Sequence, residues 1–212
     1  MTSHDKFSAA LDALPLIAIL RGITPAESQP VGKVLTQSGW RLIEVPLNSP
    51  HPLQSIATLA TTCLDALVGA GTVLRASEVR EVHAAGGQLI VSPNFNAEVV
   101  QEAVRLGMVC LPGVMTATEA FAALDAGASG LKLFPAEMAT PAVVKALRAV
   151  LPAGTLLFPV GGITPANMTA YRAAGADGFG IGSALYKPGM TTAEVGEVAL
   201  DFAAACAGNI RA

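Results

Sequence analysis

Charged residues are scarce in this sequence. Asp, Glu, Lys and Arg make up 14% of its 212 residues, whereas an average soluble domain has roughly 25%. Apolar residues reach 52% and the mean hydropathy is +0.53, a composition that excludes an intrinsically disordered chain. The 13 Lys and Arg form no basic run and are outnumbered by the 16 Asp and Glu. We therefore expect no nucleic-acid partner, because such a surface requires clustered positive charge.

Long unbroken apolar segments and paired cysteines are also missing. The longest uncharged windows, 45–64 and 149–171, are interrupted by prolines, so neither predicts a membrane-spanning helix. The first residues lack the basic and apolar regions of a secretory signal. Three dispersed cysteines without CxxC spacing are typical of reduced, buried thiols. These features predict a cytoplasmic protein without membrane contact.

The sequence does contain a repeated unit, in which an apolar strand is followed by a turn, a helix-start signal, an amphipathic stretch and a glycine. The strand candidates are almost continuously apolar, as in a parallel sheet covered by helices. Helix starts are indicated by Thr-Pro pairs at Thr24, Thr140 and Thr164, and by capping boxes at Thr24 and Thr116. The eight predicted strands are 16–20, 41–47, 66–71, 88–93, 108–113, 130–135, 156–161 and 177–182.

Eight such units predict one domain over residues 1–212, with an α/β fold of the compact (β/α)8 or TIM-barrel type. The residues before Leu16 are expected to form a short helix that closes the barrel floor. A doubly wound open sheet is the competing architecture. Its nucleotide-binding fingerprint is incomplete, because Leu74 replaces the third glycine of GxGxxG in VGAGTVL.

Two ionisable residues lie within apolar strands. Lys132 stands between two leucines in GLKLFP, so it either reaches the barrel rim or loses its hydration. A dehydrated lysine loses its proton readily and can attack a carbonyl carbon. Glu44 in RLIEVPL is equally enclosed, and burial moves a carboxyl pKa toward the range useful for proton transfer.

Together, Lys132 and Glu44 meet the two tasks of a class I aldolase, which are covalent capture of a ketone and proton transfer at the neighbouring carbon. Two alternatives give them no chemical role. Lys132 could be a rim lysine paired with Glu137 or another acid, or Lys132 and Glu44 could form a buried ion pair. A buried pair generally lowers stability, which makes a purely structural role the weaker explanation.

Glycine-rich segments follow the last two predicted strands, in PVGGITPAN (159–167) and GFGIGSALY (178–186). Gly161, Gly162 and Gly182 would let backbone amides approach an anion at helix N-termini, and Ser183 adds a hydroxyl group. Either loop alone could need glycine only for its turn. Two neighbouring loops together predict a phosphate-binding site.

The remaining strand ends offer weaker candidates. Arg21 and Thr72 are suited to a substrate carboxylate or hydroxyl, although a rim contact and a helix cap are the alternatives. Pro93 and Phe134 would form an apolar wall, or serve ordinary packing. No cluster of His, Asp and Glu recurs at the strand ends, which argues against a metal-dependent aldolase or epimerase. We expect neither a metal nor a cofactor.

Seven segments, taken in order, resemble the 2-keto-3-deoxy-6-phosphogluconate and phosphogalactonate aldolase family along nearly the whole chain. They are IEVPLNSP (43–50), GAGTVL (69–74), SPN (92–94), PGVMTATE (112–119), GLKLFPAE (130–137), PVGGI (159–163) and GIGS (180–183). The resemblance implies that Lys132 forms the Schiff base and that Glu44 is the general acid and base. It also implies a homotrimer and the following contacts: phosphate at Gly161, Gly162, Gly182 and Ser183, and substrate at Arg21 and Thr72.

Three positions differ from the pattern of the phosphogluconate enzymes, which have EVTLRT where this chain has EVPLNS. Pro46 and Asn48 replace a threonine and an arginine, and Val160 replaces a threonine before the glycine pair. These differences are similar to the phosphogalactonate branch, which implies cleavage of that branch's substrate to pyruvate and glyceraldehyde 3-phosphate. Because that arginine is absent here, the substrate carboxylate would be bound by Arg21, Thr72 or backbone amides.

Three other functions stay open. The phosphogluconate epimer could be the main substrate, or both could be used, because discrimination between hydroxyl configurations depends on hydrogen bonds that a sequence does not display. A barrel that only binds phosphorylated sugar acids would keep the glycine loops without needing Lys132 or Glu44. A metal-dependent epimerase on the same barrel is the third.

Overall fold

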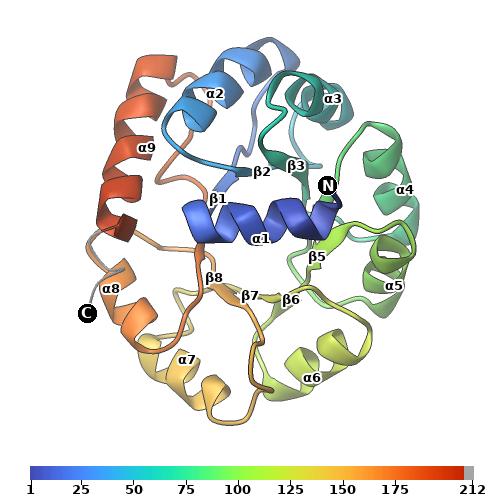
Figure 1. Cartoon of the computed structure of the whole chain (residues 1–212), viewed down its shortest axis with the longest axis vertical. Coiled ribbons are helices and arrows are strands. Elements are labelled where there is room, and N and C mark those ends of the chain that lie inside the picture. Colours follow the sequence, from blue (N-terminus) through green and yellow to red (C-terminus); the bar gives the residue numbers. More distant parts are fainter. Residues whose placement is uncertain (208–212) are drawn as a thin grey trace.

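The computed structural model describes residues 1–207 and confirms the predicted (β/α)8 architecture, with helices arranged around a parallel barrel (Figure 1). The predicted domain continued to residue 212, and residues 208–212 lie outside the described part. The strands are β1 (Leu16–Ile19), β2 (Leu42–Pro46), β3 (Leu67–Gly71), β4 (Leu89–Val91), β5 (Val109–Leu111), β6 (Gly113–Val114), β7 (Leu131–Leu133), β8 (Leu157–Pro159) and β9 (Phe179–Ile181). The helices are α1 (Ser3–Ala13), α2 (Pro25–Gln37), α3 (Pro52–Thr62), α4 (Ala76–Ala84), α5 (Ala97–Arg105), α6 (Ala117–Asp125), α7 (Pro141–Arg148), α8 (Met168–Ala173) and α9 (Thr192–Ala207).

All eight predicted strands occur, and parallel pairing runs around the barrel. One sheet has the order β5-β4-β3-β2-β1-β9 and the other has the order β6-β7-β8. Pro112 divides the fifth predicted strand into β5 and β6, because proline has no amide hydrogen for the ladder. This division transfers pairing from β4 to β7. A bridge between Val160 and Gly180 joins the two sheets on the other side.

Alternation along β2 decides which of its residues face the barrel interior. Leu42 packs in an inner cluster with Ile17 and Leu67, whereas Ile43 belongs to the outer cluster beneath the helices. Successive side chains of a strand point to opposite faces, so Glu44, two residues after Leu42, points inward. Glu44 therefore lies one layer above the inner apolar cluster.

The same rule orients the lysine of β7. Leu131 and Leu133 both belong to the outer cluster, so Lys132 between them points into the barrel. Its register partner on β6 is Gly113, which has no side chain to compete for the interior. Lys132 and Glu44 thus face the same interior from different strands.

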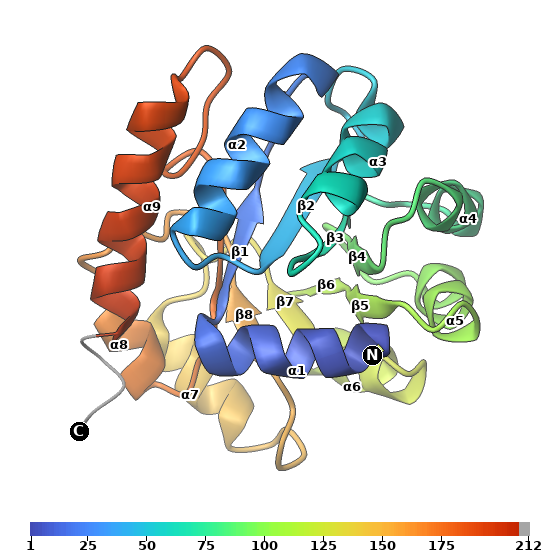
Figure 2. The same cartoon turned by 45° about the horizontal axis from the view of Figure 1, so that its top comes forward.

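Helix α1 closes the barrel floor, as predicted. Phe7 and Ala10 of α1 join the inner cluster, and the Phe7 ring centroid lies 6.1 Å from that of Phe158 on β8. Figure 2 shows α1 lying across the barrel beneath the strands. Because α1 covers the residues at the beginnings of the strands, the site must lie at their carboxyl ends.

Local signals set most helix starts. The amides of Thr24 and Thr116 each donate to the carboxylate three residues later, at 2.9 Å, and complete the two predicted capping boxes. Helices α2 and α7 begin at the prolines of their Thr-Pro pairs. Within residues 1–207, none of the helices has the length and apolar character to cross a membrane.

The predicted helix start at Thr164 is wrong. Helix α8 begins at Met168, with Asn167 as its N-cap residue. The Asn167 carboxamide oxygen accepts from the Thr164 amide at 2.9 Å, and its nitrogen donates to the Gly162 carbonyl at 2.9 Å. These side-chain bonds stabilise a turn instead of a first helical turn.

Trp40, between α2 and β2, is the largest fully buried side chain, and it provides a test of the packing. Its indole nitrogen donates to the Ala199 carbonyl on α9 at 3.1 Å, and its ring lies edge-on to Phe202. We expect Trp40→Ala to lower the free energy of unfolding by about 3–5 kcal/mol, measured by urea denaturation. The matched control is Leu64→Ala, whose side chain is 71% exposed and should have little effect. Equal losses in both variants would contradict this account of the packing.

Candidate active site

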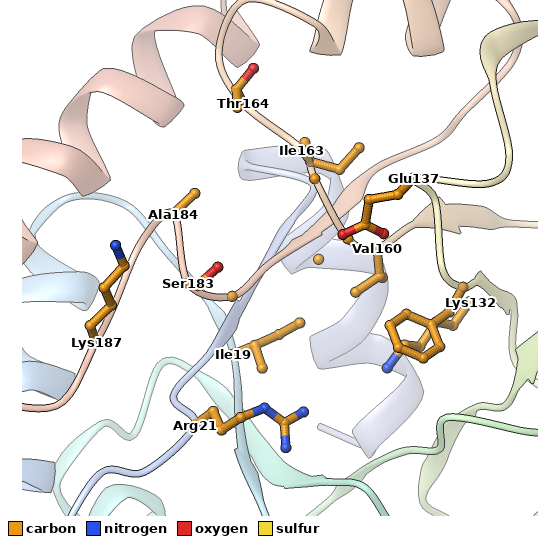
Figure 3. A pocket seen from close by; sticks show the side chains of 15 residues that line it. Ile19, Arg21, Lys132, Glu137, Val160, Ile163, Thr164, Ser183, Ala184 and Lys187 are labelled. Atoms are coloured by element: carbon orange, nitrogen blue, oxygen red, sulfur yellow. The ribbon is translucent and has the colours of Figure 1, made fainter.

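A cavity of about 400 Å³ opens at the carboxyl ends of β1, β7, β8 and β9 (Figure 3). Seven of the ten residues predicted for the site line it. They are Arg21, Lys132, Phe134, Gly161, Gly162, Gly182 and Ser183. Within the described chain, Glu44, Thr72 and Pro93 are not among the lining residues. The structure thus brings the predicted lysine and both glycine loops to one space.

Lys132 lies deep in this cavity rather than at the rim. Its side chain is only 6% exposed, and burial lowers the pKa of its amine below the ordinary value. The negative charge of Glu44 opposes this shift and the positive charge of Arg21 adds to it. The amine lies 4.6 Å from the centre of the Phe134 ring, which covers one side of it. Lys132 is therefore a lysine that gives up its proton more easily than one in water.

Glu44 shows the opposite shift. The residue is 1% exposed, and burial raises its carboxyl pKa from 4.5 to about 7, against the opposing charges of Lys132 and Arg21. One carboxylate oxygen, Oε2, is buried and has no hydrogen-bond partner among residues 1–207. A carboxyl group with a pKa near 7 can both accept and donate a proton at neutral pH.

The contacts also decide between the explanations left open for Lys132 and Glu44. In the part of the chain that the structure describes, the ion pairs join Glu102 to two arginines and Asp177 to Arg148. Lys132 is thus paired directly neither with Glu137 nor with Glu44. Their coupling is electrostatic across the barrel interior, as the pKa shifts of both groups show.

Gly71 at the end of β3 makes room for Glu44. A Cβ atom at position 71 would overlap the carboxyl group of Glu44, so any larger residue would displace that group. Thr72 follows with a φ of 58°, a left-handed conformation that is uncommon for a residue with a branched side chain. Hydrogen bonds from the Leu47 amide to the Gly71 carbonyl (2.8 Å) and from the Val73 amide to the Val91 carbonyl (3.3 Å) hold this turn. Helix α4 is capped by Arg75, so Thr72 is not its N-cap residue.

Arg21 and Asn48 connect the loops after β1 and β2. The Arg21 guanidinium donates to the Asn48 side-chain oxygen at 2.6 Å, and the Gly22 amide donates to the Ser49 hydroxyl at 2.9 Å. Arg21 is exposed at the cavity, and its charge acts on the pKa of both buried groups. Its partner is thus an amide and not an acid, which leaves its positive charge available to an anion.

Pro93 is not among the described residues that line the cavity. A Cβ atom at Gly113 would overlap the Pro93 carbonyl group, so the two backbones are in close contact. Gly113 is the register partner of Lys132. Pro93 therefore packs against β6, the strand paired with that of Lys132. It supports the predicted apolar wall through β6 and does not form the wall itself.

The two glycine loops both line the cavity and are neighbours, because a bridge between Val160 and Gly180 joins the segments that precede them. Gly161 and Gly162 have φ angles of 109° and 62°, in the region that favours glycine. After β9, the Leu185 and Tyr186 amides donate to the Gly182 carbonyl at 2.8 and 3.0 Å and form one helical turn next to Ser183. Helix α8 starts only at Met168, so no helix N-terminus lies at Gly161 and Gly162 as expected. A turn held by the side chain of Asn167 takes its place.

The two further charged residues of the cavity were not assigned to the site from the sequence. Lys187 lines the cavity beside the Ser183 loop, and Glu137 lines it beside Gly161. Lys187 follows Ser183 by four residues, a spacing that returns to the same side of a helical turn and could have indicated it. Within residues 1–207 no group of three or more His, Cys, Asp or Glu side chains is arranged to hold a metal ion.

Comparison with known proteins places this geometry in a family. The family model described as KDPG and KHG aldolase matches residues 7–199. The chain is 47% identical over 192 residues to a probable 2-dehydro-3-deoxy-6-phosphogalactonate aldolase of Rhizobium meliloti (strain 1021), covering 90% of this chain and 91% of the relative. It is also 47% identical over 190 residues to 2-dehydro-3-deoxy-6-phosphogalactonate aldolase of Escherichia coli (strain K12), covering 89% and 93%.

Solved structures agree with the sequence relatives. A structure described as native KDPGal has a TM-score of 0.92 and 44% identity, with 94% of this chain and 97% of the other covered. A KDPG aldolase from Legionella pneumophila, with pyruvate captured as a covalent carbinolamine, has a TM-score of 0.82 and 26% identity, with 92% and 97% covered. On these matches, which extend over nearly its whole length, the chain belongs to the KDPG and KHG aldolase family.

Proposed function

We propose that this protein is a class I aldolase that cleaves 2-dehydro-3-deoxy-6-phosphogalactonate to pyruvate and D-glyceraldehyde 3-phosphate. The observation that carries the proposal is the buried, electrostatically coupled pair Lys132 and Glu44, whose pKa values move toward each other. The two relatives that are 47% identical carry the name of this activity. A barrel that only binds phosphorylated sugar acids would need neither buried group.

The first half of the reaction uses the neutral amine of Lys132. It attacks the C2 carbonyl carbon of the substrate, and the resulting carbinolamine takes up one proton from solvent and loses water to give a protonated imine. Glu44, through a bridging water, then takes the proton of the C4 hydroxyl group. The C3–C4 bond breaks, its electron pair moves into the protonated imine to form an enamine, and glyceraldehyde 3-phosphate leaves.

The second half returns the proton. Glu44, now protonated, donates it to C3 of the enamine, and water hydrolyses the protonated imine to release pyruvate, the free Lys132 amine and one proton to solvent. A carboxyl pKa of about 7 suits both directions of transfer at neutral pH. The scheme needs no metal and no cofactor.

The cavity walls fit the two charged ends of the substrate. The phosphate is assigned to the turns at Gly161, Gly162, Gly182 and Ser183, beside the positive charge of Lys187. At the other end, Arg21 and Thr72 are assigned to the carboxylate, and Phe134, with Pro93 behind β6, keeps the amine in apolar surroundings. Fixing both ends orients the reacting carbons.

We further propose a single domain over residues 1–212, a homotrimeric assembly and a cytoplasmic location. The resemblance to the aldolase family supports the trimer. The location agrees with the thiols, because Cys63, Cys110 and Cys206 are all free and buried. Free thiols are usual in a reducing compartment.

Trapping of the imine tests the nucleophile. Borohydride reduction in the presence of pyruvate and a metal chelator should attach one reduced pyruvate to the peptide that contains Lys132, seen by peptide mass analysis. Lys132→Ala should give no adduct, whereas Lys145→Ala, at an exposed lysine on α7, should react like the parent protein. An unmodified parent protein would favour the non-catalytic binding barrel.

The pH dependence tests Glu44. We expect kcat/KM to rise as the pH increases through about 7, because Glu44 must be ionised to take the proton of the C4 hydroxyl group. In Glu44→Gln this rise with pH should disappear, and the rate should fall roughly 10²- to 10⁴-fold.

Stability serves as the control for that variant. The folded-state pKa of Glu44 is raised, so the parent protein loses stability as the pH rises from about 4.5 to about 7, and Glu44→Gln should not share this loss. Thermal unfolding across this window would show it. A Glu44→Gln variant whose kcat/KM still rises as the pH increases through about 7 would contradict the role assigned to Glu44.

The phosphogluconate epimer remains the second candidate substrate. Val160, which lines the cavity, cannot form a side-chain hydrogen bond, whereas the phosphogluconate pattern has threonine there. We expect a higher kcat/KM for the phosphogalactonate than for its epimer in steady-state kinetics. The reverse order would transfer the assignment to the phosphogluconate.

A further inference from the structure

Glu137 is a cavity carboxylate that the reaction scheme does not use. The turn that carries it is held to the neighbouring strand and helix through Ala136: the Ala136 amide donates to the Val160 carbonyl at 2.9 Å, and the Tyr171 hydroxyl donates to the Ala136 carbonyl at 3.0 Å. The backbone of Glu137 is thereby placed next to the loop that follows β8.

The Glu137 side chain lies along the glycine turn. A Cβ atom at Gly161 would overlap the Glu137 carboxyl group, and one at Gly162 would lie 2.9 Å from its Cγ atom. Figure 3 shows the carboxylate beside Val160, on the wall between the Lys132 amine and the turn. The two glycines therefore accommodate Glu137 as well as keeping the turn open.

This carboxylate has a distinct chemical character within the cavity. The other charged lining residues are the cations Arg21, Lys132 and Lys187, and the polar ones are the hydroxyl groups of Thr164 and Ser183. Glu137 has no hydrogen-bond or ion-pair partner within residues 1–207. A carboxylate only accepts hydrogen bonds and repels a phosphate, so its complement in a ligand is a hydroxyl group.

If the substrate is the one proposed above, the position of Glu137 in the cavity indicates which of the substrate's hydroxyl groups it contacts. The substrate chain runs from C2, bonded to Lys132, to the phosphate on C6 at the glycine turns. The C4 hydroxyl group gives its proton to Glu44 in the reaction scheme. The C5 hydroxyl, next to the phosphate-bearing carbon, passes the wall that Glu137 occupies. We propose that Glu137 is a specificity-determining residue that accepts a hydrogen bond from the C5 hydroxyl group.

The reverse reaction tests this contact directly. In the condensation with pyruvate, the C2 hydroxyl of glyceraldehyde 3-phosphate becomes the C5 hydroxyl of the product, and 3-oxopropyl phosphate is the same aldehyde without it. The parent protein should prefer glyceraldehyde 3-phosphate by about 10- to 100-fold in kcat/KM, as expected for a hydrogen bond to a charged acceptor. The quantity to compare between variants is this ratio, because the phosphate contacts are common to both aldehydes.

Glu137→Ala should bring the ratio close to one, mainly through a higher KM for glyceraldehyde 3-phosphate relative to the deoxy aldehyde. Glu137→Gln keeps an accepting oxygen and should recover part of the preference. Glu98→Ala, at an exposed glutamate on α5, is the matched control and should keep the parent ratio. If Glu137→Ala does not fold, Glu137→Met provides a side chain of similar length whose sulfur is only a weak acceptor.

The outcomes separate this inference from the proposed function. An unchanged ratio in Glu137→Ala that still forms the borohydride adduct at Lys132 would overturn the role of Glu137 alone. A parent protein that forms no adduct and condenses neither aldehyde would overturn both. A ratio lost in Glu137→Ala and partly recovered in Glu137→Gln, with the adduct intact, would support it.

Discussion

The electrostatic coupling of Lys132 and Glu44 inside the barrel is the constraint on which the site depends. Burial opposes the charged form of each group, whereas the opposite charge of the other favours it. The balance leaves an amine that loses its proton more easily and a carboxyl group with a pKa of about 7. Such a balance requires both side chains to face one dry interior, which strand alternation and the apolar layer above α1 provide.

Two glycines beside carboxylates give the site its shape. At Gly71 the missing side chain leaves space for Glu44, and at Gly161 it leaves space for Glu137. A substrate chain between these carboxylates would have the Lys132 amine at one end and the cation Lys187 beside the glycine turns at the other. Glycine is thus needed for close side-chain approach as well as for backbone approach to an anion.

Burying ionisable groups without direct ion pairs lowers stability, so the rest of the barrel must supply the compensating packing. The outer cluster between strands and helices includes Trp40, and the inner cluster is sealed by Phe7 and Phe158. The turns that carry site residues are held by specific hydrogen bonds, such as those of Asn167 at the glycine turn. The site therefore rests on rigid elements.

The sequence by itself determined the barrel, its floor helix, the capping boxes at Thr24 and Thr116, and the inward-facing candidates Lys132 and Glu44. These follow from apolar runs, strand alternation and capping patterns, which act between residues close in the chain. Only the tertiary structure decided that Asn167 delays α8, that Arg21 binds Asn48, that Pro93 lies behind β6 and that Glu137 lies along the glycine turn. Each of those outcomes depends on side chains or loops meeting in space, and local patterns carry little information about such contacts.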